Sequence, residues 1–116
     1  MKYLDLELIK ARSKKYNLHF TDSSNNNVNI TGCKVFFVVK RYSGDDESEA
    51  LINIEVTNHV SPSEGKTTVL LNYTDTDIDV MEYDYELMLI NTTIEPVYKE
   101  TILKGRLNLV DNVKKR

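Results

Sequence analysis

The stretch "EYDYELMLI", from Glu82 to Ile90, decides the fold of this chain. Large apolar residues occupy every second position, and acidic residues or methionine stand between them. The apolar set is Tyr83, Tyr85, Leu87 and Leu89. A repeat of two is that of a β-strand, whose successive side chains point to opposite faces. The stretch therefore predicts a strand with one face in a core and the other in water.

The same character recurs along the 116-residue chain, between short turns rich in Asn, Ser, Asp and Gly. We expect seven strands, at residues 3–10, 15–22, 33–42, 50–57, 66–73, 82–91 and 100–110. Two sheets packed face to face bury seven such half-apolar strands. The predicted fold is therefore all-β, an immunoglobulin-like antiparallel β-sandwich of about seven strands, with residues 1–116 as a single domain. Asp79 and Tyr83 also have the spacing that precedes a tyrosine corner.

Composition argues against several classes of function. The net charge of −3 and the pI near 5.4 provide no basic face, so we expect no nucleic-acid partner. No apolar run is long enough for a membrane span, so we expect no membrane partner. Asp5 and Glu7 interrupt the region where a signal peptide would be apolar. The single cysteine, Cys33, excludes an internal disulfide, which fits synthesis in a reducing cytoplasm.

The window "DTDIDVMEYDYE", from Asp75 to Glu86, has the carboxylate spacing of an EF-hand loop. Val80 stands where the loop needs glycine, and the alternation after Tyr83 predicts a strand instead of a helix. We therefore reject an EF-hand. A weak metal site in the turn, formed by Asp75, Asp77 and Asp79, remains as a candidate. We favour the alternative, in which Asp side chains accept hydrogen bonds from backbone amides two residues ahead.

The other reactive residues form no recognisable catalytic set. His19 lies on the polar face of a predicted strand, His59 lies in a turn, and Cys33 begins the most apolar strand. A cysteine nucleophile would need a base within hydrogen-bond reach, and no spacing supplies one. We expect no cofactor, no catalytic residues and no enzymatic activity.

The stretch "KVFFVVKRY", from Lys34 to Tyr42, is apolar on both faces. If Val35, Phe37 and Val39 face the core, then Phe36 and Val38 face outward, and Tyr42 follows them. These three residues, Phe36, Val38 and Tyr42, are our interface candidates, because exposed apolar patches often mark contact with another chain. Alternatively, the preceding loop or a terminal strand folds over them.

Four segments resemble one family when they are read in order: "ITGCKVFFVVKR", "GKTTVLLNYTDTD", "YDYELMLI" and "ILKGRLNLV". They resemble the N-terminal domain of the phage baseplate upper protein and related small phage proteins. The matching positions are Thr31, Gly32, Val35, Phe37, Val39, Lys40, Gly65, Asp75, Thr76, Tyr83, Tyr85, Gly105 and Leu107. The chain departs from the family pattern before Tyr83, where the family often has a glycine.

The resemblance implies a non-enzymatic docking and assembly module located in the virion, in a baseplate or tail, after synthesis in the bacterial host cytoplasm. Its implied partners are other phage virion proteins and copies of itself in a homo-oligomer. The alternative is a ligand-binding module that recognises a glycan or a host protein through the turns at one end of the sandwich. An inhibitor of a host enzyme also fits the acidic charge, although no particular residue supports it.

Overall fold

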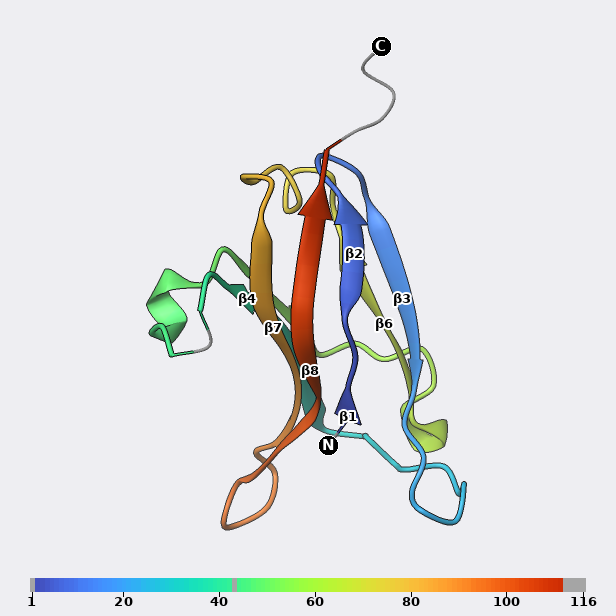
Figure 1. Ribbon diagram of the computed structural model, residues 1–116. Coiled ribbons are helices and arrows are strands. Elements are labelled where there is room, and N and C mark those ends of the chain that lie inside the picture. Colours follow the sequence, from blue (N-terminus) through green and yellow to red (C-terminus); the bar gives the residue numbers. More distant parts are fainter. Residues whose placement is uncertain (1, 43, 112–116) are drawn as a thin grey trace.

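The computed structural model describes residues 2–42 and 44–111 (Figure 1). Strands dominate this part of the chain, and its helical segments are two short 3-10 turns, η1 (Glu47–Glu49) and η2 (Pro62–Glu64). The strands are β1 (Lys2–Tyr3), β2 (Leu6–Ile9), β3 (Lys14–His19), β4 (Cys33–Lys40), β5 (Ile52–Val56), β6 (Lys66–Leu71), β7 (Glu82–Asn91) and β8 (Tyr98–Val110). Each predicted stretch contains a strand, and the all-β prediction is confirmed.

Two sheets of unequal size pack face to face (Figure 1). The larger has the order β1-β8-β7-β4-β5, with β2 also paired to β8, and the smaller consists of β3 and β6. The order β8-β7-β4-β5 facing β3-β6 is that of strands G-F-C-C′ facing B-E in a variable-type immunoglobulin domain.

The predicted β-sandwich is confirmed, and its antiparallel pairing has one departure at an edge. Strands β1 and β2 both run parallel to β8, and the remaining pairs are antiparallel. The cause is that the chain crosses from β2 in one sheet to β3 in the other instead of forming a hairpin. Strand β2 is therefore free to occupy the edge beside β8, which runs in the same direction.

The predicted first strand, residues 3–10, is interrupted between β1 and β2. The main-chain oxygen of Leu4 lies against Gly105, where an added Cβ would come within 2.3 Å of it. The same oxygen accepts a hydrogen bond from the Tyr85 hydroxyl, and Asp5 Oδ1 accepts one from the Arg106 amide at 3.1 Å. These contacts replace regular ladder bonds between β1 and β2, although the register against β8 is the same in both strands.

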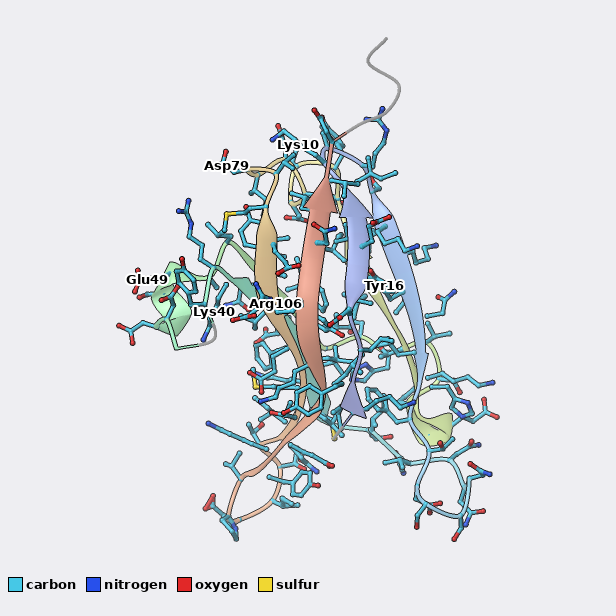
Figure 2. The ribbon with its side chains drawn as sticks, in the orientation of Figure 1. Lys10, Tyr16, Lys40, Glu49, Asp79 and Arg106 are labelled. Atoms are coloured by element: carbon cyan, nitrogen blue, oxygen red, sulfur yellow. The ribbon has the colours of Figure 1, made fainter. Side chains whose placement is uncertain are left out.

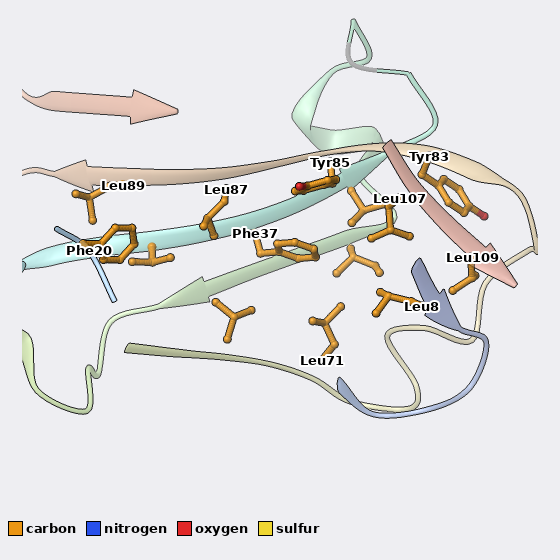
Figure 3. Packing of buried hydrophobic residues seen from close by; sticks show 14 of the residues in the cluster. Leu8, Phe20, Phe37, Leu71, Tyr83, Tyr85, Leu87, Leu89, Leu107 and Leu109 are labelled. Atoms are coloured by element: carbon orange, nitrogen blue, oxygen red, sulfur yellow. The ribbon is translucent and has the colours of Figure 1, made fainter. Parts of the chain in front are cut away.

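The two ends of the sandwich differ in how they are closed. The closed end contains the β2–β3 turn and the β6–β7 connection, and the open end contains the β3–β4 and β7–β8 connections (Figure 1). At the closed end Leu8, Leu107 and Leu109 gather beside Tyr83 (Figure 3), and none of the four is more than 3% exposed. Leu107 and Leu109 are therefore core positions of β8.

The tyrosine-corner spacing also has its structural counterpart. The Tyr83 hydroxyl donates a hydrogen bond to the main-chain oxygen of Asp79 at 2.5 Å, four residues upstream. A tyrosine that binds back to the chain in this way fixes the corner leading into its strand. Because Tyr83 is fully buried, this bond satisfies a hydroxyl that would otherwise be costly to bury.

Candidate functional site

The aspartate-rich turn of the β6–β7 connection contacts a lysine from the β2–β3 turn (Figure 2 labels Lys10 and Asp79). Lys10 Nζ lies 3.2 Å from Asp77 Oδ1 and donates to the Ile78 carbonyl at 2.7 Å. Asp75 Oδ2 accepts from the Asn72 amide at 2.8 Å, so its bond runs three residues back instead of two ahead. Within the described residues no three His, Cys, Asp or Glu side chains are placed to hold a metal. Of the three candidate ligands, Asp77 therefore pairs with a lysine ammonium and Asp75 accepts from a backbone amide.

Thr76, which the family resemblance matched without a role, joins two segments at the closed end. Its hydroxyl accepts from the Arg12 amide at 3.0 Å and donates to the Arg12 carbonyl at 2.8 Å. Its own carbonyl accepts from the Ala11 amide at 3.2 Å, and Thr76 is fully buried. These bonds tie the β2–β3 turn to the β6–β7 connection.

The predicted interface patch is not a continuous exposed surface. Val38 is only 3% exposed and Phe36 is half-buried, whereas Tyr42 is 68% exposed but lies beyond the end of β4. The reason is register: Val38 stands between Asn53 on β5 and Glu86 on β7, whose side chains flank it. The outward position of Val38 was predicted correctly, but its exposure was not.

Charged groups cover the outer face of the larger sheet beside this position. Arg106 lies 2.8 Å from Glu82 and 3.1 Å from Asp84, through Nη2 and Nε. The Thr101 hydroxyl donates to the Glu86 carboxylate. The acidic residues of β7 therefore form the polar outer face that alternation predicts.

The three residues considered for catalysis have structural partners or lie apart. Both ring nitrogens of His59 are in hydrogen bonds, to Thr67 Oγ1 at 2.9 Å and to the Cys33 carbonyl at 2.7 Å. Burial raises the pKa of the Cys33 thiol, which keeps it in the poorly nucleophilic protonated form. His19 contacts Asn27 at 2.7 Å on the exposed side of β3. The structure brings His59 to the backbone of Cys33 and leaves His19 in a separate place.

A feature that sequence analysis missed is a trough along one side of the molecule. It consists of two hollows in line, of about 150 and 670 Å³, between β3 and the β1–β2 segment. Its walls are formed by Tyr16, Leu18 and Phe20 on one side and by Lys2, Leu4 and Leu6 on the other. On its floor lie Ile102 and Leu103 of β8. We refer to these eight residues as the trough.

The trough exists because the two sheets have different widths. The Tyr16 ring of β3 lies 6.1 Å from the Phe37 ring of β4, which lies 5.7 Å from the Tyr85 ring of β7. Strand β3 is therefore positioned over β4 and β7, and the larger sheet continues beyond it with β8 and β1–β2. No third strand of the smaller sheet covers this extension in the part of the chain that the structure describes. Leu4 is consequently 48% exposed, while Leu8 on the same edge is 3% exposed.

The edge of β3 that faces the trough carries main-chain groups directed away from β6. Lys66 of β6 exchanges two hydrogen bonds with Ser61, on the side opposite to β3, and Phe20 donates to the Gly65 carbonyl at 2.8 Å. In an antiparallel pair the N–H and C=O groups of successive residues point alternately toward the partner strand and away from it. The register His19↔Lys66 and Asn17↔Thr68 therefore turns the peptide groups of His19 and Asn17 toward the free edge.

The open end carries exposed aromatic and apolar side chains, of which Tyr98 lines the larger hollow. Ile94 and Tyr98 of the β7–β8 hairpin are 48% and 46% exposed. The Tyr98 hydroxyl donates to Glu100 at 2.5 Å, and this hydrogen bond raises the pKa of Tyr98. Asp22 lines the same hollow but uses Oδ1 to accept from two amides of its own loop. The open end thus presents one aromatic face beside a wide hollow.

Comparisons with known proteins indicate a shared fold. No protein-family model matches the sequence, and no curated protein matches it significantly. The N-terminal domain of phage TP901-1 ORF48 superposes with a TM-score of 0.57 and 10% identity, over 94% of this chain and 98% of that domain. A chain from a structural study of multimeric cell-adhesive interactions of VGSC beta subunits superposes with a TM-score of 0.44 and 14% identity, over 95% and 93% of the two chains. Among the described residues no helix is long and apolar enough to cross a membrane.

Proposed function

We propose that this chain is a non-enzymatic docking and assembly module of a phage particle, located in its baseplate or tail. The observation that carries the proposal is the end-to-end similarity in fold to a domain of a phage protein, with 94% and 98% of the two chains aligned. Its partners are then other proteins of the virion, and copies of itself where the particle requires a ring.

Several residues that match the family pattern have structural roles, and these roles explain why the resemblance in sequence supports a common fold. Gly65 has a φ of +75°, and a Cβ there would come within 2.6 Å of two backbone oxygens. Tyr83 closes the tyrosine corner, and Gly105 makes room for Leu4. These positions satisfy backbone geometry that this sandwich needs, so matching residues are expected wherever the same fold recurs.

The organisation of the surface supports docking over chemistry. Cys33 and His59, two of the three groups considered for catalysis, contribute to the packing and hydrogen bonding of the sandwich. The free edge of β3 and the trough beside it instead provide main-chain groups and apolar area. These are the elements with which a β-sandwich contacts other proteins.

The test is whether the protein is found in mature particles. An antibody against the chain, combined with quantitative mass spectrometry of density-purified phage from the source culture, should find it in a fixed ratio to the tail proteins. Detection in the unassembled fraction alone would contradict the proposal. Light scattering of the purified chain, with and without calcium, separately tests the predicted homo-oligomer.

A second candidate function, ligand binding at the open end, is favoured by the hollow of about 670 Å³ beside Tyr98. An aromatic face next to polar loop groups suits a glycan or a host protein. A glycan array and a host-receptor panel should then give a saturable signal that Tyr98→Ala abolishes. The matched control is Tyr73→Ala, because Tyr73 is also exposed but lies in the β6–β7 connection at the closed end. Equal loss in both variants would contradict a site at Tyr98.

A further inference from the structure

We propose that the trough accepts one extended segment of a partner protein, which adds to β3 as a third strand of the smaller sheet. The segment has apolar side chains at every second position and acidic side chains between them. This inference rests on the proposed function and names how the docking occurs. It concerns the side of the sandwich, and not the β4 outer face that sequence analysis indicated.

Main-chain hydrogen bonding favours an extended occupant. Strand β3 pairs with β6 on one edge, and the peptide groups of Asn17 and His19 point toward the other. An extended peptide satisfies such groups by forming a ladder, as in recognition by strand addition. Strand β3 therefore combines a free edge with an adjoining apolar hollow.

The spacing of the trough walls matches the repeat of a strand. Tyr16, Leu18 and Phe20 follow one another at every second residue of the β3 segment. Lys2, Leu4 and Leu6 do the same on the facing segment. From Tyr16 to Phe20 the wall extends over roughly 13 Å at the usual rise of a strand. A third strand between the walls would place every second side chain onto Ile102 and Leu103.

The overhang of the larger sheet determines what can reach this edge. Strands β8 and β1–β2 continue past β3 and lie across the space that the trough occupies. A second sandwich of this kind could pair with β3 only by placing its own larger sheet where β8 and β1 already lie. A lone strand has no second layer and fits between them. The geometry therefore favours a segment of chain over the edge of a folded domain.

Charge indicates the character of the outward positions. On the solvent side of β3 lie Lys15, Asn17 and His19, and Lys66 stands across from His19 on β6. Residues of an added strand would lie beside Lys15 and His19, and opposite charges on adjacent strands are favourable. Acidic residues thus suit the outward positions, while apolar residues enter a smaller hollow whose lining is entirely apolar or aromatic.

The experiment is an unbiased selection of binders to the intact protein from a displayed library of random peptides of about twelve residues, long enough to span the trough. Selected peptides should share alternating apolar and acidic residues. Nuclear magnetic resonance should then show perturbations along β3 and at Leu4, and not at Phe36 or Tyr42. The chosen peptides provide a defined probe for the variants.

Two matched pairs of variants separate strand addition from general surface binding. Asn17→Pro removes a main-chain donor that points away from β6, a position where an edge strand tolerates proline. Asn17→Ala retains that donor and removes the same side-chain contact to Thr68. Leu4→Asp alters a wall residue that is 48% exposed, and Leu70→Asp alters one that is 47% exposed on the opposite face of the smaller sheet.

We expect Asn17→Pro and Leu4→Asp to weaken peptide binding by about tenfold or more, and both controls to leave it nearly unchanged. Unchanged melting temperatures in all four variants would exclude unfolding as the cause. Peptides without alternation, or binders insensitive to Asn17→Pro, would overturn the inference. Self-association of the wild type that Asn17→Pro abolishes would assign the trough to a second copy and overturn the assigned partner.

The outcome is independent of the test of the proposed function. A chain that is present in particles but binds no alternating peptide retains its place in the virion and loses the strand-acceptor role. A chain that binds such peptides through the trough but is absent from particles retains the acceptor and loses the proposed function.

Discussion

The closed and open ends of this sandwich are built from the same strands but differ in how deeply their apolar side chains are buried. On β8, Leu107 and Leu109 are at most 1% exposed, whereas Leu103, a few residues earlier, is half-buried. The N-terminal edge shows the same gradient, from Leu8 to Leu4. The difference shows that strand alternation alone does not make a core. Burial also requires a strand on the opposite sheet, and over the open end the described residues provide no such strand.

Connections between the sheets explain why the closed end is complete. Thr76 ties the β2–β3 turn to the β6–β7 connection, and Tyr83 anchors the corner into β7. These hydrogen bonds at Thr76 and Tyr83 hold the connecting loops over the ends of the strands. At the open end the β3–β4 and β7–β8 connections diverge, and the hollow of about 670 Å³ lies near them (Figure 1). The comparison separates a region specialised for stability from one available for contact.

The largest effect should come from truncating the same residue type on one strand at the two ends. Leu107→Ala removes a fully buried side chain and should lower the free energy of unfolding by about 3 kcal/mol, through lost burial and a residual cavity. Leu103→Ala should cost about 1 kcal/mol, because its side chain is only partly removed from water. Urea unfolding of both variants checks this. Equal losses would contradict the distinction between the ends.

Alkaline pH should lower the stability of the fold by ionising its buried tyrosines, above all Tyr85. Burial, and then the neighbouring Tyr16 and Asp5, raise the pKa of Tyr85 to about 12. In the unfolded chain its hydroxyl ionises near pH 10. Its contribution to stability is therefore complete below pH 10 and is lost as the pH rises toward 12, by about 2.7 kcal/mol at most.

The measurement is urea unfolding at a series of pH values from 9 to 11.5. The Tyr85→Phe variant should be less stable than the wild type at neutral pH, because it lacks the hydroxyl that donates to the Leu4 carbonyl. It should also lose less stability as the pH rises. Burial raises the pKa of Tyr83 and Tyr16 as well, so part of the slope should remain. An unchanged slope would show that Tyr85 does not carry the effect.

The Thr76 link should contribute an intermediate amount. Thr76→Val keeps the shape of the side chain but removes the hydroxyl bonds to the Arg12 amide and carbonyl, which should cost about 1 to 2 kcal/mol. Thr76→Ser retains the hydroxyl and should recover most of the loss. Hydrogen exchange should become faster at Ala11 and Arg12 in Thr76→Val and stay unchanged at the open end. Faster exchange throughout would indicate that the link is not local.

The strands could be predicted from the sequence because alternation is a local signal. The predicted range 82–91 coincides with β7, and the Asp79–Tyr83 spacing corresponds to a hydrogen bond in the structure. Pairing direction could not be predicted, because alternation does not say which strand is the neighbour. The parallel pairing of β1 and β2 to β8 depends on where the chain crosses between sheets.

The sites were harder to predict because exposure depends on register. Val38 is buried by groups on β5 and β7 that lie far away in sequence. The trough depends on the unequal widths of the sheets, and Gly105 was the one visible signal of the close approach of Leu4 to β8. A glycine within an apolar strand often marks a close approach of another backbone. It could have suggested that the N-terminal edge leaves the ladder there.

The smallest effect concerns the aspartate turn at the closed end, and it tests whether Lys10 replaces a metal ion. Because Lys10 Nζ already contacts Asp77 and the Ile78 carbonyl, millimolar calcium should leave the melting temperature of the wild type unchanged. Lys10→Met should lower the free energy of unfolding by less than about 1 kcal/mol, as expected for a partly exposed ion pair.

If the ammonium occupies the place of a cation, calcium should restore part of that loss in Lys10→Met, and the further change Asp77→Asn should abolish the recovery. A calcium-dependent rise in the wild type would mean that the carboxylates hold a metal beside the lysine. The absence of any calcium effect in Lys10→Met would mean that the three aspartates act purely as turn residues. In that case the carboxylate spacing reflects backbone geometry, and the closed end owes its stability to Thr76, Tyr83 and the leucines beneath them.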